Sequence, residues 1–261
     1  MHPIELKQKW QAGEPSPGMW IRLSDPTVCD MIGDLGFDWV IIDAEHSALD
    51  LQTLQALFIA LEGLSPLPLV RVPGNDQVYI KRVLDAGAAG VLVPQVKTLE
   101  DAKQAVAACK YPPKGVRGAG PRRPSRYGRL REGYFATANE QTIVLIMLET
   151  VDAVSSIDAI LSVEGLDGII VGPRDLAMSM GFNGNCALAE VKEVIRTVAR
   201  KARTAQISFG SGGAMMDNLR EWLTLGAQIV RVASDELLIQ CGANAAMERF
   251  HMGTAQHDRK E

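Results

Sequence analysis

Short apolar runs recur along the chain, separated by longer segments in which apolar residues return every three or four positions. The runs are rich in valine and isoleucine and lack strict alternation, which is typical of strands covered on both faces, as in parallel sheets. We predict eight strands, over residues 19–23, 39–45, 68–72, 90–96, 143–149, 168–173, 207–211 and 229–233.

The segments between these runs carry helix signals. Asp25 is a predicted N-cap with Pro26 at the first helical position, and this helix should end by Gly36. Thr98 and Asp101 match a capping box. Apolar stripes predict further helices over 50–62, 188–202 and 219–223, and a last helix is predicted over 240–250.

Strand followed by helix, repeated along the whole chain, predicts a closed (β/α)8 TIM barrel, an α/β fold. An open doubly wound sheet would carry a glycine fingerprint at its first strand-to-helix turn, but residues 24–27 read Ser-Asp-Pro-Thr. The predicted organisation is therefore a single barrel domain over residues 1–250, followed by a polar tail over 251–261.

Composition and charge narrow the function classes. The chain has 261 residues, is 47% hydrophobic and carries a net charge of −4, so it has no overall basic field for nucleic acid or an anionic membrane. No apolar run approaches the ~18 residues of a membrane span. The first residues lack a secretory-signal pattern, so we expect a cytoplasmic protein. Without a CxxC pair, the four cysteines are expected to be buried thiols; they are Cys29, Cys109, Cys186 and Cys241.

Two acids follow neighbouring predicted strands, at the end of the barrel where catalytic chemistry gathers. Glu149 ends the fifth run and Asp175 follows the sixth. With no cysteine or paired histidine beside them, they would form a hard oxygen site suited to Mg²⁺ or Mn²⁺, with Co²⁺ as a further candidate. The alternative is that each acid caps the helix that follows its strand.

A histidine and an arginine end two other predicted strands. His46 follows the second run and is a candidate general base, which Asp43 could orient; a structural histidine is the alternative. Arg71 ends the third run and could hold a carboxylate or a developing oxyanion, or pair with a nearby acid. The remaining histidines lie near the two ends of the chain; they are His2, His251 and His257.

Residues 114–131 hold seven basic residues and no acid, and their glycines and prolines predict a loop. A solvated face or a subunit contact is the simplest interpretation. Docking of an anionic substrate tail is the sharper alternative, and nucleic-acid binding ranks third because of the net negative charge.

Several stretches resemble the HpcH/HpaI aldolases, which are metal-dependent pyruvate aldolases that cleave and form 4-hydroxy-2-oxo acids. They cover most of the chain in the family's order, so the resemblance is more specific than any single motif. The stretches are DWVIIDAEHS (38–47), LVRVPGND (69–76), IKRVLDAGAAGVLVPQV (80–96), YPPKGVRG (111–118), LIMLET (145–150), VEGLDGIIVGPRDLAMSMG (163–181) and LGAQIVRVASD (225–235).

The resemblance implies roles for the strand-end residues. Glu149 and Asp175 would be the metal ligands, His46 the base acting through a metal-bound water, and Arg71 the contact of pyruvate and its enolate. The implied assembly is a homo-hexamer, a dimer of trimers, with active sites at subunit boundaries.

The resemblance also implies a partner for the base and a reaction. Asp85 of a neighbouring subunit would support the histidine, a role that Asp43 could share. The base removes the proton of the 4-hydroxyl group and the C3–C4 bond breaks, giving an aldehyde and pyruvate enolate, while a metal and Arg71 carry the enolate charge. A Schiff-base lysine is then unnecessary, and Lys97 is the nearest candidate for one.

Three departures from the family fall near the implied substrate pocket, which also includes Gly172 and Pro173. Members with sugar-acid activity commonly carry Gln at Met147, Ala at Arg174 and often Trp at Gly74. The substitutions predict a pocket that favours a second carboxylate or has a shape unlike that for the usual sugar acids.

Two other functions compete with the aldolase. A carbon–carbon lyase for CoA esters, like the citrate lyase β-subunit, could dock phosphates on residues 114–131. A barrel that binds a 2-oxo acid without turnover is the second alternative, although a binder would have no use for a base such as His46.

Overall fold

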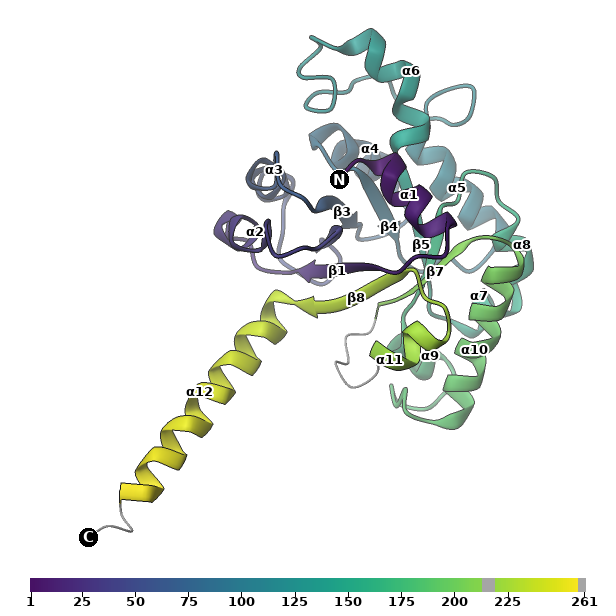
Figure 1. Ribbon diagram of the computed structural model, residues 1–261. Helices are drawn as coiled ribbons and strands as arrows, with labels where there is room; N and C mark the ends of the chain where they lie inside the picture. Colours follow the sequence, from purple (N-terminus) through teal and green to yellow (C-terminus); the bar gives the residue numbers. More distant parts are fainter. Residues whose placement is uncertain (213–218, 258–261) are drawn as a thin grey trace.

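The computed structural model describes residues 1–212 and 219–257, and its centre is a closed barrel of parallel strands (Figure 1). The strands pair in sequence order, and β1 closes the barrel against β8. The predicted (β/α)8 barrel is confirmed. The strands are β1 (Ser16–Ile21), β2 (Trp39–Asp43), β3 (Leu67–Arg71), β4 (Gly90–Val93), β5 (Ile143–Leu148), β6 (Gly168–Val171), β7 (Ser208–Ser211) and β8 (Ile229–Ser234).

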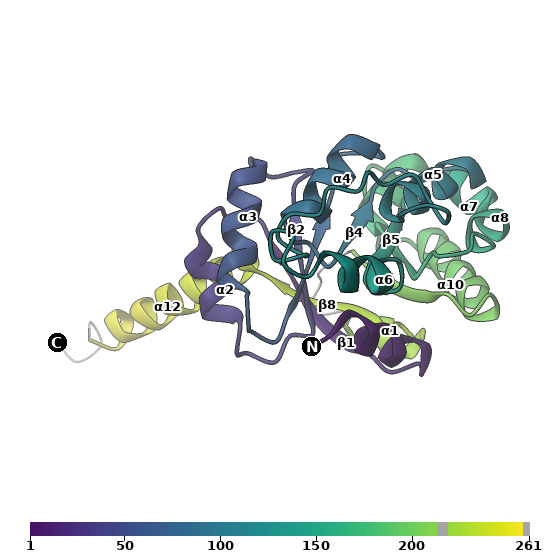
Figure 2. The same ribbon diagram turned by 90° about the horizontal axis from the view of Figure 1, so that it is seen from above.

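Helices alternate with the strands and surround the barrel, as the view from above shows (Figure 2). The helices in the described ranges are α1 (Pro3–Gln11), α2 (Pro26–Ile32), α3 (Leu51–Ala60), α4 (Gln77–Ala86), α5 (Leu99–Cys109), α6 (Arg131–Gln141), α7 (Val151–Ser155), α8 (Ile157–Leu161), α9 (Pro173–Ser179), α10 (Ala189–Thr204), α11 (Leu219–Thr224) and α12 (Asp235–His257).

The predicted helix signals at α2 and α5 are present. The side chain of Asp25 accepts a hydrogen bond from the backbone N–H of Thr27, and α2 ends at Ile32, earlier than the predicted limit. The side chains of Thr98 and Asp101 form the reciprocal capping box. Residues 114–131 contain no regular element before α6 begins, which confirms the predicted loop.

The last helix, α12, is longer than the sequence predicted. The expected helix over 240–250 lies inside it, but α12 continues to residue 257, so the helix limit at 250 was wrong. Residues 258–261 of the predicted tail lie outside the described residues. Both ribbon views show α12 projecting away from the barrel. Exposed apolar side chains on it include Leu238, Ile239, Met247, Phe250 and Met252.

The interior of the barrel is closed at its amino-terminal end by α1. Trp10 and Trp39 are buried there, and both indole N–H groups donate to the hydroxyl of Ser16, at 2.6 and 2.9 Å. Gly18 packs directly against the ring of Trp39, and a Cβ at this position would lie 2.1 Å from it. The large indole therefore requires a glycine on the neighbouring strand. A second, larger apolar core lies between the strands and the surrounding helices.

Alternation along the strands sets which residues reach the mouth of the barrel. On β2, Trp39 and Ile41 belong to the interior cluster, and Asp43 is the next residue on that face. On β3, Leu69 belongs to the same cluster and Arg71 follows it. On each strand, the polar residue that follows the last inward-facing apolar residue therefore lies at the mouth of the barrel.

The cysteines do not all match the prediction of buried thiols. Cys29 and Cys109 are buried, and burial raises the pKa of both thiols to about 12. Cys186 is half-buried and Cys241 is exposed, so the prediction was wrong for these two. Cys241 is exposed because α12 leaves the barrel. In the described part of the chain, we find no helix with the length and apolar character of a membrane span.

Candidate active site

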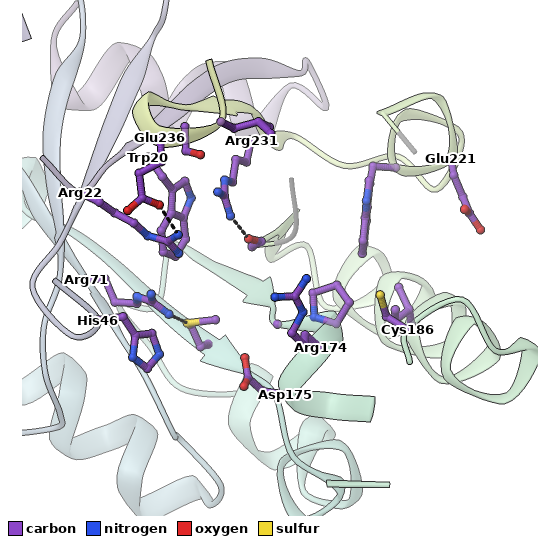
Figure 3. Close-up of a pocket in the computed structure, with 18 of the residues that line it drawn as sticks. Trp20, Arg22, His46, Arg71, Arg174, Asp175, Cys186, Glu221, Arg231 and Glu236 are labelled. Atoms are coloured by element: carbon purple, nitrogen blue, oxygen red, sulfur yellow. Dashed lines mark hydrogen bonds and ion pairs between the residues drawn. The ribbon is translucent and has the colours of Figure 1, made fainter. Parts of the chain in front are cut away.

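A cavity of about 530 Å³ opens at the carboxyl ends of the strands (Figure 3). The structure brings most of the predicted site residues to its wall. They are His46, Arg71, Met147, Gly172, Pro173, Arg174 and Asp175. Asp43 and Glu149 are buried beside this wall: Asp43 bonds Arg71, and a Cβ at Gly172 would lie 3.1 Å from Oε2 of Glu149.

Asp43 and Arg71 form the most extensively bonded pair at the site. The register of β2 and β3 places them opposite each other. The Nε and Nη2 groups of Arg71 donate to the two carboxylate oxygens of Asp43 at 2.9 and 2.6 Å. Burial would raise the pKa of Asp43, but the hydrogen bond and the charge of Arg71 outweigh it and keep the pKa low. The guanidinium is therefore fixed by a charged partner.

Arg71 also pairs with Glu45, with 3.0 Å between Nη1 and Oε2, so the predicted ion-pair alternative describes part of its environment. The same Nη1 lies 3.7 Å from the sulfur of Met147. Because its side chain still lines the cavity, Arg71 is both paired and available to a ligand.

His46 is exposed and points into the cavity beside Arg71 (Figure 3). Its Nε2 lies 3.7 Å from the carboxylate of Glu45. Asp43 accepts hydrogen bonds from the backbone N–H groups of Glu45 and His46, at 3.2 Å each. Asp43 thus holds the backbone that carries His46, and Glu45 is the acid beside the imidazole.

Glu149 is buried, with its residue 6% exposed. Its Oε1 accepts the backbone N–H of Gln95 at 2.7 Å, and Gln95 adopts the left-handed conformation, with φ of 55°. Burial raises the pKa of Glu149, and the negative charges of Asp175 and Glu45 raise it further. The three carboxylates therefore lie close enough to repel one another.

Neither predicted metal ligand caps the helix after its strand. Thr150, not Glu149, is the N-cap of α7, and Gly172 begins α9 without a side-chain cap. Asp175 lies in the first turn of α9 and faces the cavity. The helix-capping alternative is thus not what these residues do in the described structure.

The donors at this position fit a hard divalent cation. Glu149 and Asp175 supply carboxylate oxygens, and their mutual repulsion would be relieved by a positive ion. No group of three or more His, Cys, Asp or Glu side chains in the described ranges has the arrangement of a complete metal site. Mg²⁺ commonly takes one or two carboxylates and completes its shell with substrate and water.

The cavity residues that the strand-end reasoning missed include Trp20, Arg22 and Arg231. The guanidinium carbons of Arg71 and Arg231 lie 4.4 and 4.8 Å from the Trp20 ring centroid, and that of Arg22 lies at 5.9 Å. Both missed arginines stand at or just after an otherwise apolar strand. A charged residue in such a run was the signal that could have revealed them.

Asp85 and the basic loop lie elsewhere in the chain. Asp85, on α4, pairs with the buried Arg117 at 2.8 Å and does not line the cavity, so a single chain does not bring it to His46. Within residues 114–131, Arg117 is buried and Arg123 pairs with Glu62, so these two are not freely solvated. Lys97 is not part of the cavity wall.

Acid–base and anion-binding groups at the carboxyl ends of a (β/α)8 barrel define a barrel of the enzyme type. The chain belongs to the HpcH/HpaI aldolase/citrate lyase family, whose model matches residues 17–240. The family and its named relatives identify an enzyme of the lyase class, of aldolase type.

Individual relatives cover nearly the whole chain. The 4-hydroxy-2-oxo-heptane-1,7-dioate aldolase of Salmonella typhimurium is 38% identical over 247 residues, 94% of each chain. An HpcH/HpaI aldolase/citrate lyase family protein from Burkholderia cenocepacia has a TM-score of 0.91 at 29% identity, covering 95% of this chain and 99% of that one. The citrate synthase SbnG has a TM-score of 0.85 at 29% identity, with 96% and 98% covered.

Proposed function

We propose that the protein is a divalent-metal-dependent aldolase that reversibly cleaves a 4-hydroxy-2-oxo acid into pyruvate and an aldehyde. The observation that carries the proposal is the pair of carboxylates from neighbouring strand ends, Glu149 and Asp175. They repel each other, and neither caps a helix in the described residues. Family membership and the name of the Salmonella typhimurium relative support the same reaction class.

Glu149 and Asp175 would hold Mg²⁺ or Mn²⁺, with Co²⁺ as a further candidate. When bound, such an ion supplies Lewis acidity toward the keto oxygen of the substrate. A lysine Schiff base is not needed for this chemistry. Lys192, which does line the cavity, is paired with Glu221 at 3.2 Å.

The chain's own residues would carry the remaining steps. His46 would remove the proton of the 4-hydroxyl group, since its imidazole is exposed and lines the cavity. The C3–C4 bond then breaks, the aldehyde leaves, and the electron pair stays on the pyruvate portion, where return of the proton from His46 to C3, directly or through solvent, gives pyruvate and restores the base. Arg71 stabilises the negative charge that develops there, since Asp43 fixes its guanidinium beforehand.

A cleavage screen tests the proposal. A panel of 4-hydroxy-2-oxo acids is incubated with Mg²⁺, Mn²⁺ or Co²⁺, and pyruvate release is followed with a coupled assay, with and without EDTA. We expect metal-dependent pyruvate release from at least one substrate and its loss in EDTA. Cleavage that is unaffected by EDTA after exhaustive dialysis would contradict metal dependence, and no cleavage of any substrate would contradict the aldolase.

The proposed assembly is a homo-hexamer in which Asp85 of a neighbouring subunit supports His46. Support comes from the placement of Asp85 away from the cavity of its own chain and from the exposed apolar side chains of α12. Mixing subunits of inactive Asp85→Ala and His46→Ala variants tests this sharing. Partial recovery of activity is expected, and no recovery in a mixed assembly would contradict it.

A carbon–carbon lyase acting on CoA esters is the second candidate. The family description includes citrate lyase, and a similar solved structure is named a citrate synthase. Turnover of CoA thioesters, measured beside free 4-hydroxy-2-oxo acids under the same conditions, separates the two. A barrel that only binds a 2-oxo acid would turn over neither.

A further inference from the structure

The cavity at the carboxyl ends of the strands extends beyond the residues that the proposed reaction uses. Its volume of about 530 Å³ lies within the range for drug-sized ligands, ~300–1,000 Å³, so a short 2-oxo acid fills only part of it. Figure 3 shows Cys186 and Glu221 on the side of Arg174 away from His46 and Arg71. We call this part of the cavity the far lobe. The residues that line it are Cys186, Lys192, Ile195, Glu221, Trp222 and Leu225.

The far lobe is built by α10, by the loop before it, and by α11 with the residue after it. The Nζ of Lys192 on α10 lies 3.2 Å from Oε2 of Glu221 on α11, so an ion pair joins the two helices at the lobe. The ring of Trp222 contacts that of the buried Phe209 on β7, with 5.9 Å between the ring centroids. The indole is therefore held against the barrel while it lines the cavity.

The surface that the far lobe offers to a ligand is apolar and carries no net charge. Ile195 is buried, while Cys186, Trp222 and Leu225 are half-buried, and all four line the cavity. The lysine and the glutamate of the lobe pair with each other, so their charges cancel. An indole and smaller apolar side chains gain free energy when an apolar group covers them.

Arg174 stands between the far lobe and the reaction centre without closing the passage, because one cavity includes both sides. A Cβ at Gly184 would lie 3.2 Å from Cγ of Arg174, so the stem of this arginine packs against the loop after α9. Such a stem presents methylene groups along the passage. A substrate whose 2-oxo acid head is held by Arg71 can therefore reach the far lobe only with its C4 end.

We infer that the far lobe binds an uncharged apolar group, of the size of an aromatic ring, carried on C4 of the substrate. Trp222 is then a specificity-determining residue, and the aldehyde released by cleavage carries this group. The inference rests on the proposed function for the identity of the 2-oxo acid head. Of the two sequence-based expectations for the pocket, it favours a shape unlike that for the usual sugar acids.

Calorimetric titration with three unreactive ligands tests the far lobe. The ligands are 2-oxo acids that lack the 4-hydroxyl group and differ only in the group on C4. This group is phenyl in 2-oxo-4-phenylbutanoate, methyl in 2-oxopentanoate and carboxylate in 2-oxoglutarate. We expect the full-length protein, with Mg²⁺, to bind the phenyl ligand about tenfold or more tightly than either of the others, because an aromatic ring buries a large apolar area.

Three variants connect the preference to the far lobe. Trp222→Ala should weaken binding of the phenyl ligand about tenfold or more and leave that of the methyl ligand within about twofold. Leu223→Ala is the matched control, because Leu223 is the next residue on α11, is 44% exposed and does not line the cavity. It should leave both affinities unchanged. Cys186→Phe fills the far lobe, so it should also abolish the phenyl preference, and it tests the lobe if Trp222→Ala fails to fold.

Several results would overturn the inference. They are a wild type without a phenyl preference, tighter binding of 2-oxoglutarate than of the phenyl ligand, and equal weakening of the phenyl and methyl ligands by Trp222→Ala. A second copy of the chain could also cover the far lobe. In that case Trp222→Ala would change the oligomeric state in size-exclusion chromatography and leave the affinity for the phenyl ligand unchanged, which would equally overturn the inference.

Failure of this inference is distinguishable from failure of the proposed function. The three ligands are bound and not cleaved, so the preference is measured without turnover. A phenyl preference that is lost in Trp222→Ala, in a protein that cleaves no 4-hydroxy-2-oxo acid, would keep the far lobe as a binding site and reject the aldolase. Cleavage by a wild type that lacks the preference would do the reverse.

Discussion

The replacement Asp43→Asn removes the charge that fixes Arg71 while keeping the size of the side chain. Asp43 is fully buried and accepts from Arg71 at 2.9 and 2.6 Å and from Arg22 at 3.0 Å. An amide can accept through only one of its terminal atoms, so at least one guanidinium donor would face an NH₂ group.

The structure gives the size of the expected loss. Removing one partner of a buried ion pair costs 3–5 kcal/mol, and because the amide retains one acceptor we expect about 3 kcal/mol for Asp43→Asn. For a domain of this size, that lowers the melting temperature by about 6–12 °C. Arg71 would also lose its fixed orientation, so kcat/KM should fall about tenfold to a hundredfold.

Asp38→Asn is a matched control. Asp38 is also buried and accepts from Lys9 at 2.6 Å, but it lies just before β2, at the end of the barrel opposite the cavity, and Lys9 is partly exposed. Its loss should cost about 1 kcal/mol or less and leave cleavage unchanged. Thermal unfolding and coupled pyruvate release measure both effects.

The pH dependence of stability gives a second test of the same variant. The native pKa of Asp43 is lowered, so its charge stabilises the fold fully above the unfolded value near pH 4. That stabilisation is lost as pH falls through the native pKa, so the wild type and Asp43→Asn should converge in strong acid. If Asp43→Asn were as stable and active as Asp38→Asn at neutral pH, the assigned role of Asp43 would be refuted.

Other predictions concern the barrel itself. Gly90→Ala should lower the free energy of unfolding by about 3 kcal/mol, because its Cβ would lie 2.3 Å from the backbone oxygen of Ile143. Gly74→Ala, whose Cβ would meet nothing within 4 Å, should leave the stability nearly unchanged. Equal denaturation midpoints for the two variants would contradict this. Burial and the charge of Lys7 lower the pKa of Lys110 from 10.5 to about 8. The unfolded state therefore binds more protons in that interval, and the stability of the wild type relative to Lys110→Met should rise by up to about 3 kcal/mol between these pH values. Denaturant unfolding of both proteins at several pH values measures this, and a stability difference that stays constant over the interval would contradict the lowered pKa of Lys110.

The barrel could be predicted because the strands are continuous apolar runs, separated by helical segments in which apolar residues return every three or four positions. The same runs gave the strand ends, and with them Asp43, Arg71 and Glu149. Strand pairing then brought these residues together without any further information, since neighbouring parallel strands end at the same mouth.

The details of contact could not be predicted. Asp43 was expected near the imidazole of His46, but it bonds the backbone there, because its carboxylate is taken by Arg71 and Arg22. Arg231 was hidden within an apolar run, and its place at the cavity depends on the closure of β8 against β1 beside Trp20. Such closure is a tertiary event that local sequence does not encode.

The length of α12 and the position of Asp85 could not be predicted from spacing or periodicity, for another reason. A helix that projects away from the barrel needs no apolar face to pack against it, so periodicity could not predict where α12 ends. Asp85 stands inside a helical pattern and pairs with Arg117 in its own chain. No spacing rule marks such a residue for a site.

The central claim is that Glu149 and Asp175 jointly hold a divalent cation, and Mn²⁺ binding tests it most directly. Free Mn²⁺ is measured by electron paramagnetic resonance during titration of the wild type, Glu149→Gln, Asp175→Asn and the remote control Asp158→Asn, an exposed acid paired with Lys201. The account predicts Mn²⁺ binding by the wild type and the control, and affinity at least about tenfold weaker in each of the other two variants. Unchanged Mn²⁺ affinity in both Glu149→Gln and Asp175→Asn would contradict it.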